Sequence, residues 1–222
     1  MKLLQKRLLF LILFTVVGFF TLQIPFNKLA GSNVSFTLFD FFAPIAGAFL
    51  GPFFGITSVF SVEVVNIWVK HAPLTTGSVI RLFPTLFAVY YFANVAKKGN
   101  YKPWILLVPL ICIVAFIIHP IGRQVFYYPL MFWTIPILAY RFRNNLFMKS
   151  LGATFTAHAV GGTAWIWAFN LPASVWNSLI PVVIAERLLF ATGIAGSYIV
   201  VKHTLNFLVE KKILPKLDVA TN

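Results

Sequence analysis

The sequence has 222 residues, of which 59% are hydrophobic and 10% are charged, and its formal net charge is +13. A soluble domain usually has about 25% charged residues, so these figures exclude an ordinary water-soluble globule and predict one integral membrane domain, residues 1–222. The positive residues stand in short clusters between apolar runs, which is typical of membrane topology signals, so nucleic-acid binding is not expected. The single Cys112 excludes an internal disulfide and a cysteine-based metal site.

Apolar runs separated by charged residues, Pro or Gly predict an all-α, polytopic transmembrane helical bundle of about six to eight helices. The expected segments are roughly 8–26, 34–50, 53–69, 77–96, 103–119, 126–141, 151–171 and 178–201. The first is expected to be a retained helix, because no small-x-small signal-peptide cleavage site follows it. Several segments are shorter than the ~20 residues that cross a bilayer. We therefore expect the second and third to form a broken pair, and the fifth and sixth to be short or tilted.

Lysine and arginine are divided unevenly between the two predicted faces of the bilayer. With the N-terminus inside, thirteen of them lie on the inner face and four on the outer face. Positive residues accumulate on the cytoplasmic side, so both termini are expected to be cytoplasmic in the cell membrane. Residues 202–222 are expected to form a short cytoplasmic tail whose helical part ends at Pro215.

Residues 39–55, FDFFAPIAGAFLGPFFG, combine an acid at one end with a helix breaker at the other. Alanine or glycine recurs every fourth residue from Ala43 to Gly55, which favours close helix packing or a hinge beside a solute cavity. Pro52 cannot continue a helix, because it lacks an N–H and clashes with the preceding turn. The stretch predicts a short helix begun by Asp40, a turn at Gly51 and Pro52, and a new helix after it.

The new helix carries a polar face. Glu63, Asn66 and Lys70 are spaced i, i+3, i+7, so they share one side of the helix. A carboxylate inside a membrane normally faces a cavity or a partner. Glu63 is therefore explained either by a binding site or by a structural ion pair with Arg81 or Arg187.

The segment 151–171 carries a second polar face. Thr154, His158 and Trp165 lie on one side of the expected helix, with two glycines, at 161 and 162, between them. Glycine makes room for a flat ligand, an indole stacks on it, and His and Thr orient it. Alternatively, His158 bridges two helices by a hydrogen bond and the glycines merely allow close packing.

An outer loop is expected at 170–181, before the last membrane helix. It contains Asn170, Trp176 and Asn177, and its tryptophan could also be an interface anchor.

The last helix contains the adjacent residues Glu186 and Arg187, which point about 100° apart on a helix. At least one of them is therefore expected to pair with another helix, and the candidate partners are Glu63, Arg81 and Asp40.

The sequence contains no Walker motif, no H-E-x-x-H and no G-x-S-x-G. The four histidines do not form a metal-ligand pattern. We therefore expect no catalytic residue, no metal and no cofactor, and we do not expect an enzyme.

The stretch FDFFAPIAGAFLGPFFGITSVFSVEVVNIW, within residues 37–68, resembles the second and third helices of the substrate-binding S components of energy-coupling-factor (ECF) vitamin transporters. It covers about a seventh of the chain. The resemblance implies a compact helical bundle that binds a vitamin or similar micronutrient near the outer face. It also implies docking on a shared transmembrane coupling subunit with two ATPases.

Carried over by position, the resemblance places Asp40, Glu63 and Asn66 near the ligand pocket, with further contacts from the last two helices. The leading hypothesis is a membrane-embedded, substrate-binding subunit for vitamin uptake and transport. The alternatives are a structural or assembly membrane protein without a ligand, and an intramembrane lipid-acting enzyme with His158 and Glu186 as acid and base. The complete expected substrate-binding set is Asp40, Glu63, Asn66, Arg81, Thr154, His158, Trp165, Asn170, Trp176, Asn177, Glu186 and Arg187.

Overall fold

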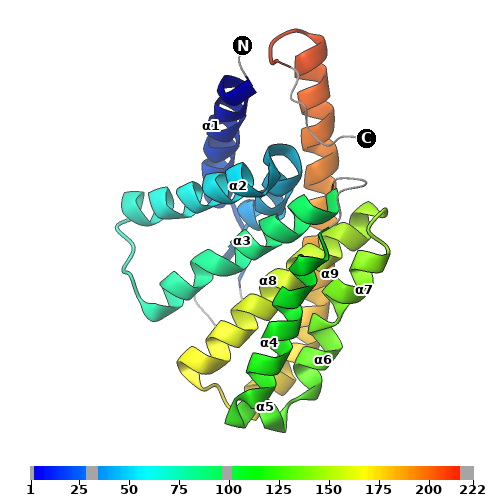
Figure 1. Ribbon diagram of the computed structural model, residues 1–222. Coiled ribbons are helices and arrows are strands. Elements are labelled where there is room, and N and C mark those ends of the chain that lie inside the picture. The colour runs from blue at the N-terminus through cyan, green and yellow to red at the C-terminus, as the bar shows by residue number, and fades with distance from the viewer. Residues whose placement is uncertain (1–2, 29–34, 97–101, 216–222) are drawn as a thin grey trace.

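The computed structural model describes residues 3–28, 35–96 and 102–215, which form an all-α bundle with one small two-stranded hairpin (Figure 1). The longer helices are α1 (Leu3–Leu22), α2 (Leu38–Val69), α3 (Thr76–Ala96), α8 (Leu146–Phe169) and α9 (Ala173–Glu210). The shorter ones are the 3₁₀-helix η1 (Pro103–Leu106), α4 (Leu107–Ile118), α5 (Pro120–Gln124), α6 (Tyr127–Trp133) and α7 (Ile135–Arg141). Strands β1 (Pro25–Lys28) and β2 (Ser35–Thr37) pair antiparallel.

Four of the described helices, α1, α2, α3 and α9, are long and apolar enough to cross a membrane. This confirms the predicted helical class and a multi-pass membrane protein. The expectation of short segments after residue 102 is also confirmed, because α4 has 12 residues and α6 and α7 have 7 each.

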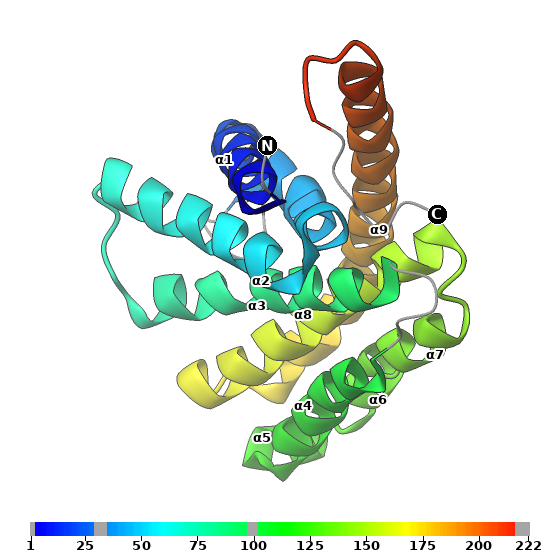
Figure 2. The same ribbon diagram turned by 45° about the horizontal axis from the view of Figure 1, so that its top comes forward.

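The helices lie in successive layers, which Figure 2 shows in the order α2, α3, α8 and then α4 with α6. Helices α1 and α9 both pack against α2. One buried apolar cluster joins α1, α2 and α3, and a second joins α4, α6 and α8. Both clusters also include residues of α9, so α9 connects the two halves of the bundle.

The predicted break at Gly51 and Pro52 is confirmed. Gly51 has φ 79° and ψ 174°, a conformation outside the helical region that glycine adopts readily. A Cβ built on Gly55 would lie 3.0 Å from the backbone of Ala46, nine residues earlier. The two halves of α2 therefore fold sharply back on each other, and the small residues allow this close approach.

The start of α2 also agrees with the prediction, although the preceding residues do not. Thr37 is the N-cap, and its backbone N donates to Asp40 Oδ2 at 2.8 Å in a capping box. The carboxylate thus lies at the positive end of the helix dipole. The helix was expected from residue 34, but residues 35–37 form β2, because they hydrogen-bond to β1.

Helix α9 is longer than predicted at both ends. The expected outer loop at 170–181 is wrong, because helix α9 begins at Ala173 and runs without a break through Pro181. The predicted helical extension after residue 201 is confirmed as far as Glu210, and residues 216–222 of the predicted tail lie outside the described residues. At 1.5 Å per residue, 38 residues span about 57 Å, nearly twice the ~30 Å hydrocarbon core.

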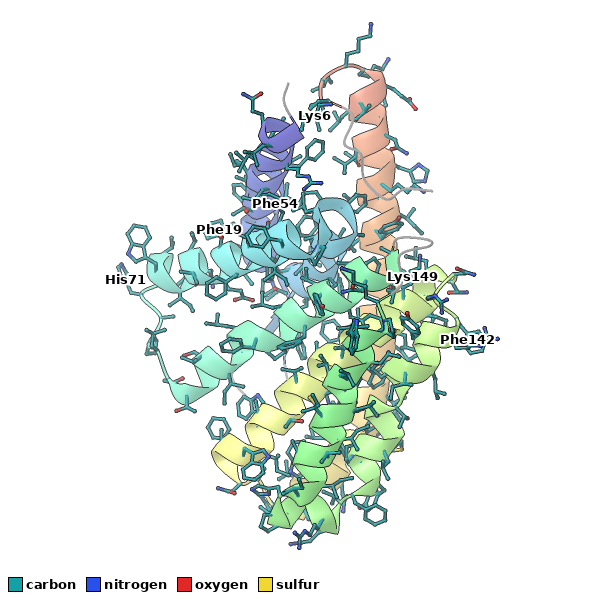
Figure 3. The ribbon with its side chains drawn as sticks, viewed as in Figure 1. Lys6, Phe19, Phe54, His71, Phe142 and Lys149 are labelled. Atoms are coloured by element: carbon teal, nitrogen blue, oxygen red, sulfur yellow. The ribbon has the colours of Figure 1, made fainter. Side chains whose placement is uncertain are left out.

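Two of the basic residues predicted for the inner face are labelled in Figure 3. Lys6, near the start of α1, is at the top of Figure 3 and Lys149, near the start of α8, is at its right. His71, in the connection between α2 and α3, lies at the left. Lys2, Lys97, Lys98 and Lys216, which belong to the same predicted clusters, lie outside the described residues.

Candidate functional site

A cavity of about 1190 Å³ lies between α2, α3, α8 and α9, with additional walls from the end of α1 and from β2. Three of the five acidic residues in the whole sequence line it, namely Asp40, Glu63 and Glu186. Ionisable side chains within membrane segments are rare and usually face a functional cavity. A volume of this size holds a vitamin-sized molecule, so this cavity is the candidate site.

The structure brings most of the predicted substrate-binding residues together. Ten of the twelve line this one cavity, although they come from distant parts of the chain. They are Asp40, Glu63, Asn66, Arg81, Thr154, His158, Trp165, Trp176, Glu186 and Arg187.

The two remaining predicted residues lie elsewhere. Asn170 is the left-handed C-cap of α8, and its Oδ1 lies 2.9 Å from Nε2 of the buried His119. Tyr127 donates its hydroxyl hydrogen to Asn177 Oδ1 at 2.6 Å. Both amides therefore hold α8 and α9 to the neighbouring segment 119–127.

His158 bridges α8 to α6 through both of its ring nitrogens. Trp133 Nε1 donates to His158 Nδ1 at 3.1 Å. An indole N–H can only donate, so Nδ1 accepts, and the neutral imidazole carries its proton on Nε2. That Nε2–H then donates to the Tyr128 hydroxyl oxygen at 3.2 Å. His158 therefore lines the cavity with its ring, while its polar atoms are occupied by the protein.

The two glycines of α8 differ in what lies beside them. A Cβ on Gly162 would come within 2.7 Å of Trp133 Cζ2, so this position admits the indole of Trp133. A Cβ on Gly161 would meet Pro84 of α3 at 3.4 Å, an ordinary contact. The close-packing interpretation thus holds for Gly162, and the indole occupies the space expected there for a ligand.

Replacing Trp133 by phenylalanine is expected to lower the free energy of unfolding by about 1–3 kcal/mol, because His158 Nδ1 would be left buried without its donor. Trp104→Phe is the matched control, since Trp104 is 70% exposed, and it should change stability by less than about 0.5 kcal/mol. Thermal unfolding of the purified protein in detergent measures both. Equal unfolding temperatures for the two variants would contradict the proposed contribution of this hydrogen bond.

Glu186 and Arg187 pair with each other, so the candidate partners Glu63, Arg81 and Asp40 are wrong, although Arg187 does bind another helix, as expected, through Thr154 of α8. Arg187 Nη2 lies 3.3 Å from Glu186 Oε2, and only about a tenth of either side chain is exposed. The Cβ atoms of the two residues point about 100° apart. The arginine side chain is nevertheless long enough to bend back and reach the carboxylate of its neighbour.

The guanidinium of Arg187 also makes two contacts beyond Glu186. Its Nη1 donates to Thr154 Oγ1 of α8 at 3.2 Å. Its centre lies 4.3 Å from the ring centroid of Phe190, within the range of a cation–π interaction. The pair thus joins α9 to α8 beside the cavity.

The polar face of α2 lies along the cavity, as the spacing of Glu63, Asn66 and Lys70 predicts. Asn66 Oδ1 accepts a hydrogen bond from Gln23 Nε2 at 3.1 Å. Within the described part of the chain Glu63 makes no hydrogen bond and no ion pair, which rules out the alternative of a structural ion pair with Arg81 or Arg187. Arg81 lies close enough to act on it electrostatically without touching it.

Sequence reasoning missed three residues that shape the site, namely Gln23, Tyr128 and Trp133. Gln23 is a lone amide at the end of an apolar run. Tyr128 and Trp133 belong to an aromatic stretch, YYPLMFW, that reads as ordinary core. No rule of helix spacing relates Tyr128 and Trp133 to His158, or Gln23 to Asn66. The sequence therefore carries no signal for these contacts.

Comparison with known proteins found one match of substantial length. Over 220 residues the chain is 30% identical to "Uncharacterized protein MJ0923" of Methanocaldococcus jannaschii, and the match covers 90% of this chain and 72% of that protein. No family model and no solved structure matches the chain.

Proposed function

Since the chain belongs to the same family as MJ0923 of Methanocaldococcus jannaschii, whose name states no activity, we propose a function from the cavity itself. We propose a membrane-embedded subunit that binds a small, vitamin-like micronutrient for uptake. The observation that carries the proposal is the gathering of three of the chain's five acids around one large cavity. Buried charge of this kind is retained where a site needs it.

The proposed cycle follows from this cavity and from the resemblance of residues 37–68 to S components. The subunit, with both termini cytoplasmic in the cell membrane, captures its ligand from outside. An ECF-type coupling subunit with two ATPases then moves it, and the ligand is released inside. The sharp turn at Gly51 supports the proposal, because it orients the half of α2 that carries Glu63 toward the cavity.

The contacts at the cavity favour binding over catalysis. Both ring nitrogens of His158 and a carboxylate oxygen of Glu186 are already occupied by protein groups. Proton transfer to a lipid would require these atoms to reach a substrate. We therefore propose no enzymatic activity for this site.

Mass spectrometry of molecules released from the purified, denatured protein tests the proposal. The wild-type protein is expected to carry a small molecule. Thr85→Trp places an indole into the cavity from its wall on α3, so this variant is expected to lose the molecule. Thr192→Trp is the matched control on the exposed face of α9 and should retain it. If the wild-type protein carries no small molecule and binds none of a panel of vitamins, the proposal fails.

A further inference from the structure

The polar groups of the cavity fall into two sets, which differ in whether other protein groups bind them. On α8 and α9 most polar groups at the cavity are held by another protein group, although the buried Nε of Arg187 has no hydrogen-bond partner in the described chain. His158 is bound by Trp133 and Tyr128, Arg187 by Glu186 and Thr154, and Trp176 Nε1 donates to the carbonyl of Leu171 at 3.2 Å. On this side of the cavity the protein itself therefore satisfies most of the polar side chains.

The opposite wall, formed by α2 and α3, is not satisfied in this way. Glu63, Lys70 and Arg81 all line the cavity, and none of their side chains makes a hydrogen bond or an ion pair with another described residue. The amide of Asn66 uses its oxygen to bind Gln23, and its NH₂ group makes no bond in the described chain. Charged groups in a membrane cavity are normally paired, so the partly buried Glu63 has room for a partner from a ligand. Lys70 and Arg81 are exposed, and their side chains are available to bind one.

The charges on this wall are ordered along the helix. Glu63 and Lys70 are seven residues apart on one helix face, which corresponds to about 10 Å along the axis. Lys70 and Arg81 are exposed and flank the α2–α3 connection, whereas Glu63 is only partly exposed and lies near Asp40. The wall therefore has a positive outer end and a negative inner end.

The other acids of the cavity do not need a ligand. Asp40 is bound by the backbone of Thr37, and Glu186 is bound by Arg187. Glu63 is the one cavity carboxylate of the described chain without a direct partner. A group that donates hydrogen bonds, and above all a protonated nitrogen, is what a single carboxylate in a membrane cavity binds most favourably.

We propose that the cavity binds a zwitterionic, ring-containing ligand, with its anionic end at Lys70 and Arg81 and its protonated nitrogen at Glu63. The inference rests on the proposed binding function and specifies its substrate class. Trp165 and Phe190 line the same cavity and provide apolar surface for the ring. Glu63 and Lys70 stand about two helical turns apart along α2, which selects a molecule of roughly that length.

Three probes of one shape test the charge pattern on the full chain in lipid nanodiscs. The zwitterion 4-(2-aminoethyl)benzoate is compared with 4-ethylbenzoate, which has the anion alone, and with 2-(4-methylphenyl)ethylamine, which has the cation alone. Isothermal titration calorimetry measures each affinity. The zwitterion is expected to bind at least about tenfold more tightly than either analogue, because each charge adds one charge-assisted interaction.

Two sets of variants assign the ends. In Glu63→Gln the zwitterion is expected to bind no more tightly than 4-ethylbenzoate. In the double variant Lys70→Gln/Arg81→Gln it is expected to bind no more tightly than 2-(4-methylphenyl)ethylamine. Glu210→Gln and Lys211→Gln remove the same charges at exposed positions on α9 and next to its end, outside the cavity, and should leave all affinities unchanged. Thermal unfolding of every variant confirms that each is folded before binding is compared.

The inference is overturned if the zwitterion binds no more tightly than both analogues, if none of the probes binds, or if the α2 and α3 variants behave like the controls. Its failure can be told apart from that of the proposed function. A neutral or singly charged molecule released from the wild-type protein, and lost in Thr85→Trp, would overturn the zwitterionic class while the binding function stands. Absence of any bound molecule would overturn both.

Discussion

Arg187→Met is expected to lower the free energy of unfolding by about 3–5 kcal/mol. The substitution keeps much of the side-chain volume but leaves Glu186, whose side chain is 10% exposed, without its cation. It also removes the hydrogen bond to Thr154 and the cation–π contact with Phe190. Breaking one side of a buried pair is strongly destabilising because the other charge remains uncompensated.

The single cysteine gives a direct measurement of this effect. Cys112 is 7% exposed, so a thiol-reactive fluorescent dye reports unfolding as the sample is heated in detergent. The double variant Glu186→Gln/Arg187→Met should recover part of the loss, because no buried charge is left unpaired. Arg123→Met, at an exposed position, should match the wild type. An unfolding temperature of Arg187→Met equal to that of the wild type would contradict the proposed pairing.

Gly47→Ala is expected to lower the free energy of unfolding by about 1–3 kcal/mol. A Cβ on Gly47 would collide with the backbone carbonyl oxygen of Val89 and lie 3.0 Å from the backbone N of Ala93, both on α3. Backbone atoms cannot rotate out of the way as a side chain can. The added methyl group therefore has to push α2 and α3 apart, across one of the main contacts of the bundle.

Gly196→Ala is the matched control, because it adds the same methyl group to a glycine of α9 with no heavy atom within 4 Å. Alanine is the better helix former by about 1 kcal/mol, so this variant should be as stable as the wild type or more so. The dye assay on Cys112 compares the two. If Gly47→Ala and Gly196→Ala shift the unfolding temperature in the same direction by the same amount, the close approach of α2 and α3 is not important for stability.

Local chemistry made part of this structure predictable. The turn at Gly51 follows from the backbone limits of proline and glycine, and the face shared by Glu63, Asn66 and Lys70 follows from the period of a helix. The same period places Thr154, His158 and Trp165 on one side of α8. These features depend on residues within a few turns of each other, which a sequence displays directly.

Features that depend on distant partners could not be predicted. The bonds of His158 require residues 25 and 30 positions earlier to fold against α8. Arg187 bends back to Glu186, a choice that depends on the packing of Phe190 and Thr154 around it. The expected loop at 170–181 is helical from Ala173 onward, and Pro181, a residue that breaks helices in water, stands inside α9. Membrane helices tolerate proline, because neighbouring groups can satisfy the freed carbonyl.

The turn at Gly51 has a consequence for chirality. Nothing in the described chain lies within 4 Å of a Cβ built at this position, so there is space for a side chain. Its φ of 79° and ψ of 174° are nonetheless the mirror image of an ordinary extended conformation. An L-amino acid is therefore disfavoured here by its backbone conformation and not by lack of space. The position at which α2 reverses requires glycine, the one achiral amino acid.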